Sequence, residues 1–455
     1  MIRCTLRRWL HVAACAVAAR AGVGREVPLV LLHTADFHGR LVNLVPEAGV
    51  PMEAGLWRCA TLVRQIRERE PNVIWVDCGD TVQGTLESLT SGGRLMVEAL
   101  ARAGCDAWVI GNHDFDWGLP ALRALVERAP MPVLAANVEP APGAPPPLPG
   151  ARAWVIREIG GVRVGLVGTT HPTTPRWQPP GWMEGLLIRA PQDTIGGALP
   201  ALRAAGADVL VLAIHEGLRP GREDPAPGAA ALAGRFPDFD VILGAHTHEA
   251  VAEQILGGGV LYAQAGFHGQ WLGRVDLVYD TVQRRVVRKR GTLLPVDGSV
   301  EPDPGLDALA RPALVRASNQ LARVIARVSG PWLGDEVAPG DEPVARLLRR
   351  AILEESGAEV VLHGRLSDAE LAGPELRLRD IWQWVPYENR IGICRWTAAE
   401  IRAAMEEMLS TASKTAIGIT GLRAHIDPSA PAGSRVVRLE LPDGSAPHPR
   451  RRFHV

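Results

Sequence analysis

The sequence predicts an α/β fold with helices on both faces of a mixed β-sheet, followed by a second, smaller α/β (α+β) domain. The chain has 455 residues, more than one ordinary core supports. From Pro28 to about Tyr279, apolar β-rich runs recur between helical patterns. These runs are apolar throughout rather than alternating, which is typical of strands covered on both faces. A turn-rich acidic segment at 296–307 then precedes a region with its own helices and strands.

Composition limits the class of protein. Hydrophobic residues make up 47% of the chain and charged residues 22%, which suits a soluble globular protein. The net charge of −1 gives no electrostatic reason to expect a nucleic-acid polymer as partner. No segment after the N-terminal region is long and apolar enough to predict a membrane span. The sequence leaves the oligomeric state open.

The cysteines predict no metal ribbon. Cys59, Cys78, Cys105 and Cys394 are widely spaced, without a Cys-x-x-Cys pair, and no disulfide follows from the sequence. We expect small buried thiols.

Residues 1–21 predict a secretory signal peptide, and hence a periplasmic or extracellular protein. Arg3, Arg7 and Arg8 form a basic start, a short apolar stretch follows, and Ala19-Arg20-Ala21 fits a cleavage site. The alternative is an unstructured N-terminal tail.

The first domain is expected at 27–295. Its predicted strands lie at 28–35, 72–80, 106–114, 132–138, 162–170, 208–215 and 240–248. Helical patterns occupy 56–70 and 92–104, the second ending at Gly104, a favourable helix stop.

The rest of the chain is expected to form a linker at 296–328 and a substrate domain at 329–455. Within the linker, a connecting helix is predicted at 308–328. The second domain is predicted to have helices at 343–356 and 397–409, and strands at 358–364, 390–396 and 435–441.

Polar side chains follow five of the predicted strands. The strand ends carry His33–Gly39, Asp77–Asp80, Asn112-His113, His215-Glu216 and Gly244–His248. In an open α/β sheet, ligand sites form beyond the carboxyl ends of the strands, so we expect these loops to converge.

The residue types in these loops predict a metal site. Aspartate, asparagine and histidine are ligands for divalent ions and need no thiolate. Asp36-x-His38 and His246-x-His248 each place two ligands on one side of an extended segment. Seven candidate ligands exceed the four of a closed zinc site, so two ions are expected, sharing one carboxylate. Any one of these residues alone could instead be structural; Asp80, for example, could cap a helix.

These motifs resemble a known family. "HTADFHG", "DCGDTVQG", "GNHDFDWG", "LAANV", "HEG" and "GAHTH", with "VPYEN" and "ITGLRAHIDPSAPAGSRV" later, are similar to the exported 5'-nucleotidase family of calcineurin-like metallophosphoesterases. The resemblance covers roughly residues 28–455. It implies a metallophosphoesterase β-sandwich flanked by helices, with a 5'-nucleotidase C-terminal domain.

The resemblance also assigns roles in the metal centre. It implies two divalent ions, drawn from zinc, manganese, magnesium, cobalt or iron. One ion would be bound by Asp36, His38 and His248, and the other by Asn112, His215 and His246, with Asp80 bridging them. His113 would stabilise charge on the phosphoryl group, and Asp116 would orient its ring. Asp114 stands where the family usually has glutamate and receives no chemical role.

In the second domain the resemblance is weaker. Tyr387 and Asn389 match the aromatic and amide groups that contact a base, and Arg365 is a displaced counterpart of a substrate-binding arginine. The glycine triplet expected near 363–369 is absent, aliphatic residues replace a second aromatic near 415–421, and the chain stops before the family's glycine-rich aromatic segment. The nucleotide pocket is therefore expected to be altered or truncated.

Together these features predict a dimetal phosphoesterase that hydrolyses small phosphate esters by attack of a metal-bound hydroxide on phosphorus, with nucleotides as the leading substrate class. The family includes 5'-nucleotidases, UDP-sugar hydrolases and cyclic-nucleotide phosphodiesterases. Two alternatives remain at this stage: a related thiosulfohydrolase of sulfur oxidation, and a non-catalytic metal-binding or interaction protein.

Overall fold

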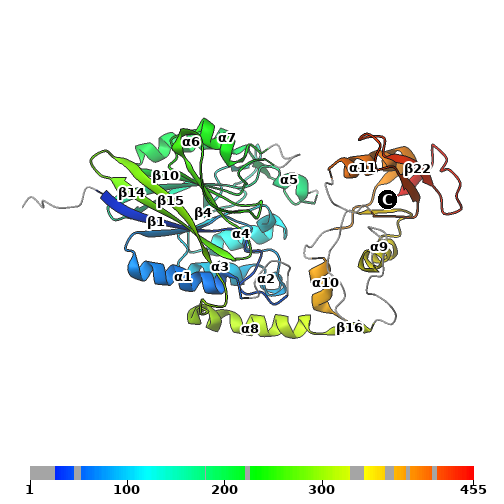
Figure 1. Ribbon diagram of the computed structural model, residues 1–455, viewed down its shortest axis with the longest axis horizontal. Helices are drawn as coiled ribbons and strands as arrows, with labels where there is room; N and C mark the ends of the chain where they lie inside the picture. The colour runs from blue at the N-terminus through cyan, green and yellow to red at the C-terminus, as the bar shows by residue number, and fades with distance from the viewer. Residues whose placement is uncertain are drawn as a thin grey trace, which may run out of the picture.

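The computed structural model describes residues 26–45, 53–179, 181–220, 226–327, 343–363, 374–385, 390–411 and 418–455. The predicted signal peptide lies outside the described residues, as do Arg365, Tyr387 and Asn389. Figure 1 shows a large layered domain, a long helix α8 along its side, and a smaller C-terminal domain. Among the described helices, none combines the length and apolar character that crossing a bilayer requires.

The first sheet of the large domain has seven strands in the order β15-β14-β1-β2-β3-β4-β6. β1, β2, β3, β4 and β6 run parallel, whereas β14 at one side is antiparallel to β1, and the edge strand β15 is antiparallel to β14. The bounds are β1 Glu26–Thr34, β2 Val73–Asp77, β3 Ala107–Val109, β4 Val133–Leu134, β6 Ala151–Arg152, β14 Trp271–Asp280 and β15 Arg285–Pro295.

The second sheet has six strands in the order β12-β13-β11-β10-β8-β7. Its four central strands are parallel, and the edge strands β12 and β7 are antiparallel to their neighbours. The bounds are β7 Trp154–Ile159, β8 Val162–Thr169, β10 Val209–Ile214, β11 Val241–Gly244, β12 Ala250–Ile255 and β13 Leu261–Ala265.

The two sheets pack face to face, and helices cover the two outer faces (Figure 1). On β1, Leu29 and Leu31 face the inner core between the sheets, while Val30 and Leu32 face the helices, as the two-residue period of a strand requires. α1 Leu56–Arg69, α3 Arg94–Arg102 and α4 Leu119–Arg128 cover the first sheet, and α8 Pro304–Leu321 packs against α3 on the outside of this helix layer (Figure 1). α6 Pro191–Ala204 and α7 Gly228–Arg235 cover the second sheet.

This arrangement confirms the helix-flanked β-sandwich that the resemblance implies. The apolar runs alone predicted one mixed sheet with helices on both faces, and this prediction is wrong because the strands form two sheets. Those strands are covered on both faces, but one cover is a helix layer and the other is the second sheet.

A histidine is buried in the core between the sheets. His33 follows Leu29 and Leu31 on the inner face of β1, is 0% exposed, and lies opposite Gly273 of β14. A Cβ on Gly273 would lie 2.0 Å from His33 Nε2, so only glycine leaves room for this ring. Neither ring nitrogen has a hydrogen-bond partner among the described residues, and burial lowers the pKa of His33 to about 4.

Short elements complete the large domain. They are α2 Leu86–Ser91, the 3-10 turns η1 His113–Phe115 and η2 Gly257–Gly259, the strand pair β5 Val138–Pro140 and β9 Leu186–Ile188, and α5 Thr174–Trp177. The single strand predicted at 132–138 is thus two strands in different sheets, β4 and β5.

The C-terminal domain consists of helices and two-stranded ladders. Its elements are β16 Val324–Arg327, α9 Pro343–Ser356, β17 Val361–His363, β18 Glu375–Arg377, α10 Leu378–Trp384, β19 Arg395–Thr397, α11 Ala398–Thr411, β20 Gly418–Thr420, β21 Arg423–Ile426, β22 Val436–Glu440 and β23 Arg452–His454. Val360, Ile401, Met405, Leu439 and Phe453 belong to its core.

Two predictions in this region are wrong. The connecting helix predicted at 308–328 begins at Pro304 and ends at Leu321, and 324–327 instead forms β16, paired with β18. The strand predicted at 390–396 begins only at Arg395, as β19, because its partner β23 pairs with it over three residues.

The four described cysteines are free. Cys59, Cys78 and Cys105 are buried, as expected, but Cys394 is exposed, which corrects the prediction of a buried thiol there.

Candidate metal centre

The polar loops predicted to converge do so at the carboxyl ends of the central strands of both sheets. β1 leads into Asp36 and His38, and β2 leads into Asp80. β10 leads into His215, and β11 leads into His246 and His248. Two groups of three potential ligands result: Asp36, His38 and His248, and Asp80, His215 and His246.

The backbone is strained where these side chains emerge. Asp36, His38, Asp80, His246 and His248 all have φ between +48° and +70°. The only other non-glycine residues with positive φ in the described parts of the chain are His268 and Arg284. Such conformations are costly for residues with a Cβ and cluster at functional sites. These backbone conformations direct the aspartate and histidine side chains toward one another.

Glycines allow the loops to approach one another. Gly79 has φ +98°, and a Cβ there would lie 2.6 Å from the Gly111 nitrogen. A Cβ on Gly111 would lie 2.2 Å from Asp80 Oδ1. The glycines of "DCGD" and "GNHD" therefore let Asp80 lie directly against the loop of Asn112 and His113.

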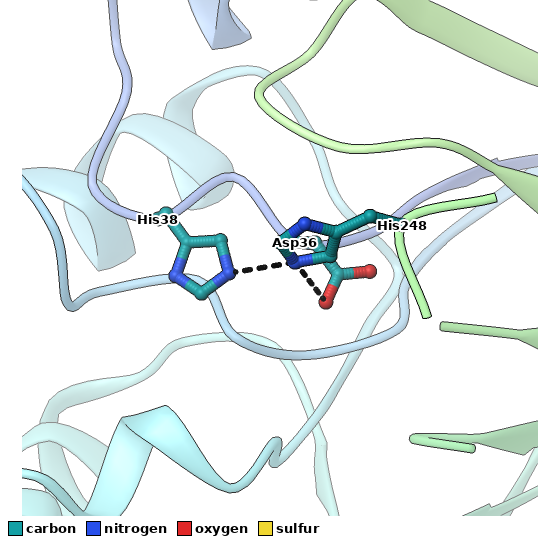
Figure 2. A group of neighbouring side chains, drawn as sticks. All are labelled: Asp36, His38 and His248. Carbon is teal, nitrogen blue, oxygen red and sulfur yellow. Dashed lines mark hydrogen bonds and ion pairs between the residues drawn. The ribbon is translucent and has the colours of Figure 1, made fainter. Parts of the chain in front are cut away.

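The first group is shown in Figure 2. His38 Nε2 lies 3.1 Å from His248 Nε2, and His248 Nε2 lies 3.7 Å from Asp36 Oδ1. His38 Nδ1 lies 3.3 Å from Gln83 Oε1, a contact that leaves Nε2 as the nitrogen facing His248. Burial lowers the pKa of His38 well below its usual value, which favours the neutral imidazole that binds metals. Two ring nitrogens facing each other beside a carboxylate suit a shared cation.

The second group surrounds His215. Its Nε2 lies 3.0 Å from Asp80 Oδ2 and 3.9 Å from Asp36 Oδ1. Its Nδ1 lies 2.8 Å from the Cys78 carbonyl oxygen and donates to it, which orients Nε2 toward the carboxylates. Asn112 Oδ1 is buried and has no hydrogen-bond partner among the described residues, so an acceptor is available on the same loop.

Asp80 lies between the two groups. Its Oδ2 is 3.0 Å from His215 Nε2 and 4.0 Å from His38 Nε2. Burial would raise the pKa of Asp80, but His215 and His113 hold it well below the usual range. Burial likewise opposes protonation of His215, yet the charge of Asp80 raises its pKa to about 10. An ionised carboxylate within reach of both groups fits a pair of divalent ions that share one ligand.

His113 and Asp116 form a hydrogen-bonded pair beside these groups. His113 Nδ1 lies 2.7 Å from Asp116 Oδ2, and the His113 amide donates to Asp80 Oδ1 at 2.7 Å. Burial would lower the pKa of His113, but Asp80 and Asp116 raise it to about 9. The ring is therefore positioned as a cationic donor at the edge of the metal groups.

Two residues that the sequence analysis left without a role support this centre. Asp114 is buried, and its carboxylate accepts hydrogen bonds from the amides of Asp80, Thr81, Val82 and Gly111 at 2.8–3.1 Å. Gln178 Nε2 donates to Asp116 Oδ1 at 2.8 Å, so it extends the His113–Asp116 pair by one residue. Asp114 was visible in "GNHD" as a fourth polar residue, whereas nothing in the sequence near Gln178 indicates its partner.

A cavity of about 910 Å³ opens beside the metal groups. Asn112, His113 and Asp116 are among the residues that line it. Trp177, Gln178, Trp182 and His246 also line it, together with residues 390–392 of the C-terminal domain. The structure thus brings together all nine residues predicted for the metal centre and the catalytic pair. The three predicted substrate contacts, Arg365, Tyr387 and Asn389, lie outside the described residues.

The fold and site define a calcineurin-like phosphoesterase, and family comparison agrees. The profile of calcineurin-like phosphoesterases matches residues 29–250, and that of the 5'-nucleotidase C-terminal domain matches residues 324–455. The chain therefore belongs to the family that joins these two domains, the 5'-nucleotidase family. This agrees with the resemblance seen in its motifs.

Individual relatives are distant. A snake venom 5'-nucleotidase of Naja atra is 27% identical over 323 residues, which cover 66% of this chain and 59% of that protein. The chain thus spans about three fifths of that relative's length. The 5'-nucleotidase precursor of Thermus thermophilus has a TM-score of 0.73 at 24% identity, covering 94% of this chain and 89% of that one. A sulfate thiohydrolase of Thermus thermophilus shares the fold, with a TM-score of 0.67 at 20% identity, covering 94% and 88%.

Proposed function

We propose that this protein is a metal-dependent phosphoesterase that hydrolyses small phosphate esters, with nucleotides as the leading substrate class. The observation that carries the proposal is the position of Asp80, within 4.0 Å of both histidine groups and bonded to the amide of His113. A structural carboxylate would not need two histidine groups and a separate histidine–aspartate pair around it.

The residues fit two divalent ions. Asp36, His38 and His248 would hold one, Asn112, His215 and His246 would hold the other, and Asp80 would be shared. When bound, such ions supply Lewis-acid polarisation of a phosphoryl group and a nucleophile at neutral pH. The donors are oxygen and imidazole nitrogen, a set that zinc, manganese, magnesium, cobalt and iron all accept.

His113 would act on the phosphoryl group directly. With Nδ1 bonded to Asp116, its other ring nitrogen can donate a hydrogen bond to an oxygen that gains charge in the transition state. Asp116 fixes the ring orientation and favours its protonated form, and Gln178 in turn fixes Asp116. This arrangement favours catalysis over the alternative of a non-catalytic metal-binding protein, because neither His113 nor Asp116 belongs to the two metal groups.

The substrate class comes from the relatives rather than from the described site. The matching C-terminal domain and the curated 5'-nucleotidases favour a nucleotide. A 5'-nucleotidase, a UDP-sugar hydrolase and a cyclic-nucleotide phosphodiesterase are all compatible with the metal centre. We also infer export, from the predicted leader at 1–21, which N-terminal sequencing of the secreted protein would test.

The decisive experiment combines metal analysis with a panel of phosphomonoesters, cyclic diesters and diphosphates. We expect two ions per wild-type chain and hydrolysis of at least one ester class. Asp80→Ala should lose the bound ions and the hydrolytic activity. The control Asp238→Ala changes an exposed carboxylate paired with Arg203 and should keep the ions and the activity. Near-normal turnover in Asp80→Ala with two ions retained would contradict the two-metal assignment. A fully metallated wild type that hydrolyses no phosphate ester would contradict the proposed reaction.

A further inference from the structure

We propose that Trp177 and Trp182 form an aromatic subsite on the large domain that stacks against the leaving group of the phosphate ester. The preferred substrates would then be esters whose leaving group carries a flat aromatic ring, such as a nucleobase or an aryl group. This inference rests on the proposed function, because it concerns the leaving-group side of that same reaction.

Trp177 is placed unusually for a tryptophan. Its residue is 48% exposed, although few large apolar side chains in the described structure are exposed to this degree. It ends the short helix α5, and its ring is stacked on His246, with centroids 5.5 Å apart and planes 19° apart. His171 lies beneath it as well, at 4.7 Å. The ring is therefore held against one of the metal-group histidines while a large part of it remains open.

Trp182 lies in the same cavity. The guanidinium of Arg390, from the C-terminal domain, lies 4.5 Å from its ring centre. Such a contact orients the ring and places a positive charge next to it.

The cavity connects both rings to the reacting centre. Its lining includes Asn112 and His113 together with Trp177, Trp182 and Arg390. Its volume of about 910 Å³ is within the range of pockets that enclose a ligand of nucleotide size. A phosphoryl group next to His113 would thus direct its leaving group into a space walled by two indoles.

The chemistry of the walls selects the ligand. Indole faces stack on flat aromatic rings largely irrespective of ring substituents, and each such stack commonly changes affinity by about tenfold or more.

Two matched probes separate the aromatic contact from phosphoryl binding. Phenylphosphonate and methylphosphonate share the phosphonate group and differ in the ring. Calorimetric titration of the manganese-loaded protein should give a Kd for phenylphosphonate about tenfold lower than that for methylphosphonate. Trp177→Ala and Trp182→Ala should each bring the ratio of the two Kd values toward one. Val282→Ala, a change at an exposed site away from the cavity lining, should leave the ratio unchanged.

Trp182 makes the test independent of the metal groups. Trp177→Ala removes a ring that stacks on His246, so metal content is measured alongside. Trp182 contacts Arg390 instead, so its variant should keep two ions. An unchanged affinity ratio in both tryptophan variants would overturn the subsite. Failure of the proposed reaction would show differently, as an absence of ester hydrolysis in wild type while the binding ratio is intact.

Discussion

Replacing Asp114 by asparagine should destabilise the large domain and loosen the metal loops. Each carboxylate oxygen of Asp114 accepts two backbone hydrogen bonds. Oδ1 receives the amides of Thr81 and Val82 at 2.9 and 3.0 Å, and Oδ2 receives those of Asp80 and Gly111 at 3.1 and 2.8 Å. The asparagine side chain would keep one oxygen and present an NH₂ group where the other oxygen was. Two of the four N–H donors would then face another donor.

The size of the effect follows from those two lost acceptors. An unsatisfied buried polar group costs about 1–3 kcal/mol, and hydrogen bonds to a charged acceptor are at the stronger end. Two such losses give about 4 kcal/mol, a large fraction of the stability of an ordinary domain. The backbone of Asp80 is strained, with φ +53°. Because this conformation is costly, the loop would relax to a less strained one after losing the hydrogen bonds to Asp114, and the metal ligands would move with it.

The assay is urea unfolding of the metal-free protein at about pH 8.5, followed by metal analysis of the reloaded protein. At this pH the Asp114 carboxyl is largely ionised, since burial and the charge of Asp80 raise its pKa to about 7. Asp303→Asn is the matched control. Asp303 caps α8 and accepts hydrogen bonds from the amides of Gly305 and Leu306 through Oδ1, a role that asparagine fills equally well. Its Oδ2 accepts a hydrogen bond from Arg64 Nε at 3.4 Å, and the loss of such a solvent-exposed ion pair costs little.

We expect Asp303→Asn to change the free energy of unfolding by less than about 1 kcal/mol. We expect Asp114→Asn to lower it by about 4 kcal/mol and to lose metal. If both variants behaved alike and both kept two ions, the Asp80 loop would have to be held by contacts other than the Asp114 carboxylate.

Three further predictions concern other parts of the site and core. His113→Ala should lower turnover about 100-fold with two ions retained, the scale of losing a preorganised transition-state donor; release of metal would instead make His113 a ligand. Gln178→Leu should lower kcat about tenfold with KM little changed, because it misorients Asp116 and through it His113. In a His113→Ala background the same change should have no further effect, and additive losses would contradict this coupling. His33→Leu should reduce the loss of stability on acidification. The pKa of His33 is about 4 in the folded protein and about 6.5 in the unfolded chain, so the unfolded chain binds more protons between these pH values. The free energy of unfolding of the wild type therefore falls as the pH drops through this window. Between about pH 8 and pH 5 this amounts to about 2 kcal/mol, measured as the difference between wild type and variant in urea unfolding at the two pH values; equal acid sensitivity would contradict it.

The sequence predicted the convergence of the polar loops because each loop can be recognised locally. Asp36, Asp80 and His215 each follow directly on an apolar run, so strand and loop could be recognised together without knowledge of the partner strands. Parallel strands then bring their carboxyl ends to one edge, whatever the order of the strands in the sheet. The convergence of the loops therefore did not depend on knowing that the strands divide into two sheets.

The parts that could not be predicted depend on contacts between distant segments. An apolar strand shows that both its faces are covered, but Leu31 and Leu32 are equally apolar whether a helix or a second sheet lies beyond them. The strand at 324–327 has a helix-compatible sequence, and it is the pairing with 375–377 that determines its conformation.

Gln178 shows the same limit at the level of function. Its sequence neighbours include no second polar catalytic group, and its significance arises only because the chain returns to Asp116, 62 residues away, at hydrogen-bond distance. Trp177, directly before it, is stacked on His246 from the loop that follows β11. Residues that bind metal are recognisable by type and spacing, since few side chains can do this chemistry. Residues that orient a catalytic pair or contact a leaving group can be of many types, so only their positions in space identify them. We therefore expect the specificity of this protein to depend on residues such as Trp177 and Trp182, for which the sequence alone predicts no role.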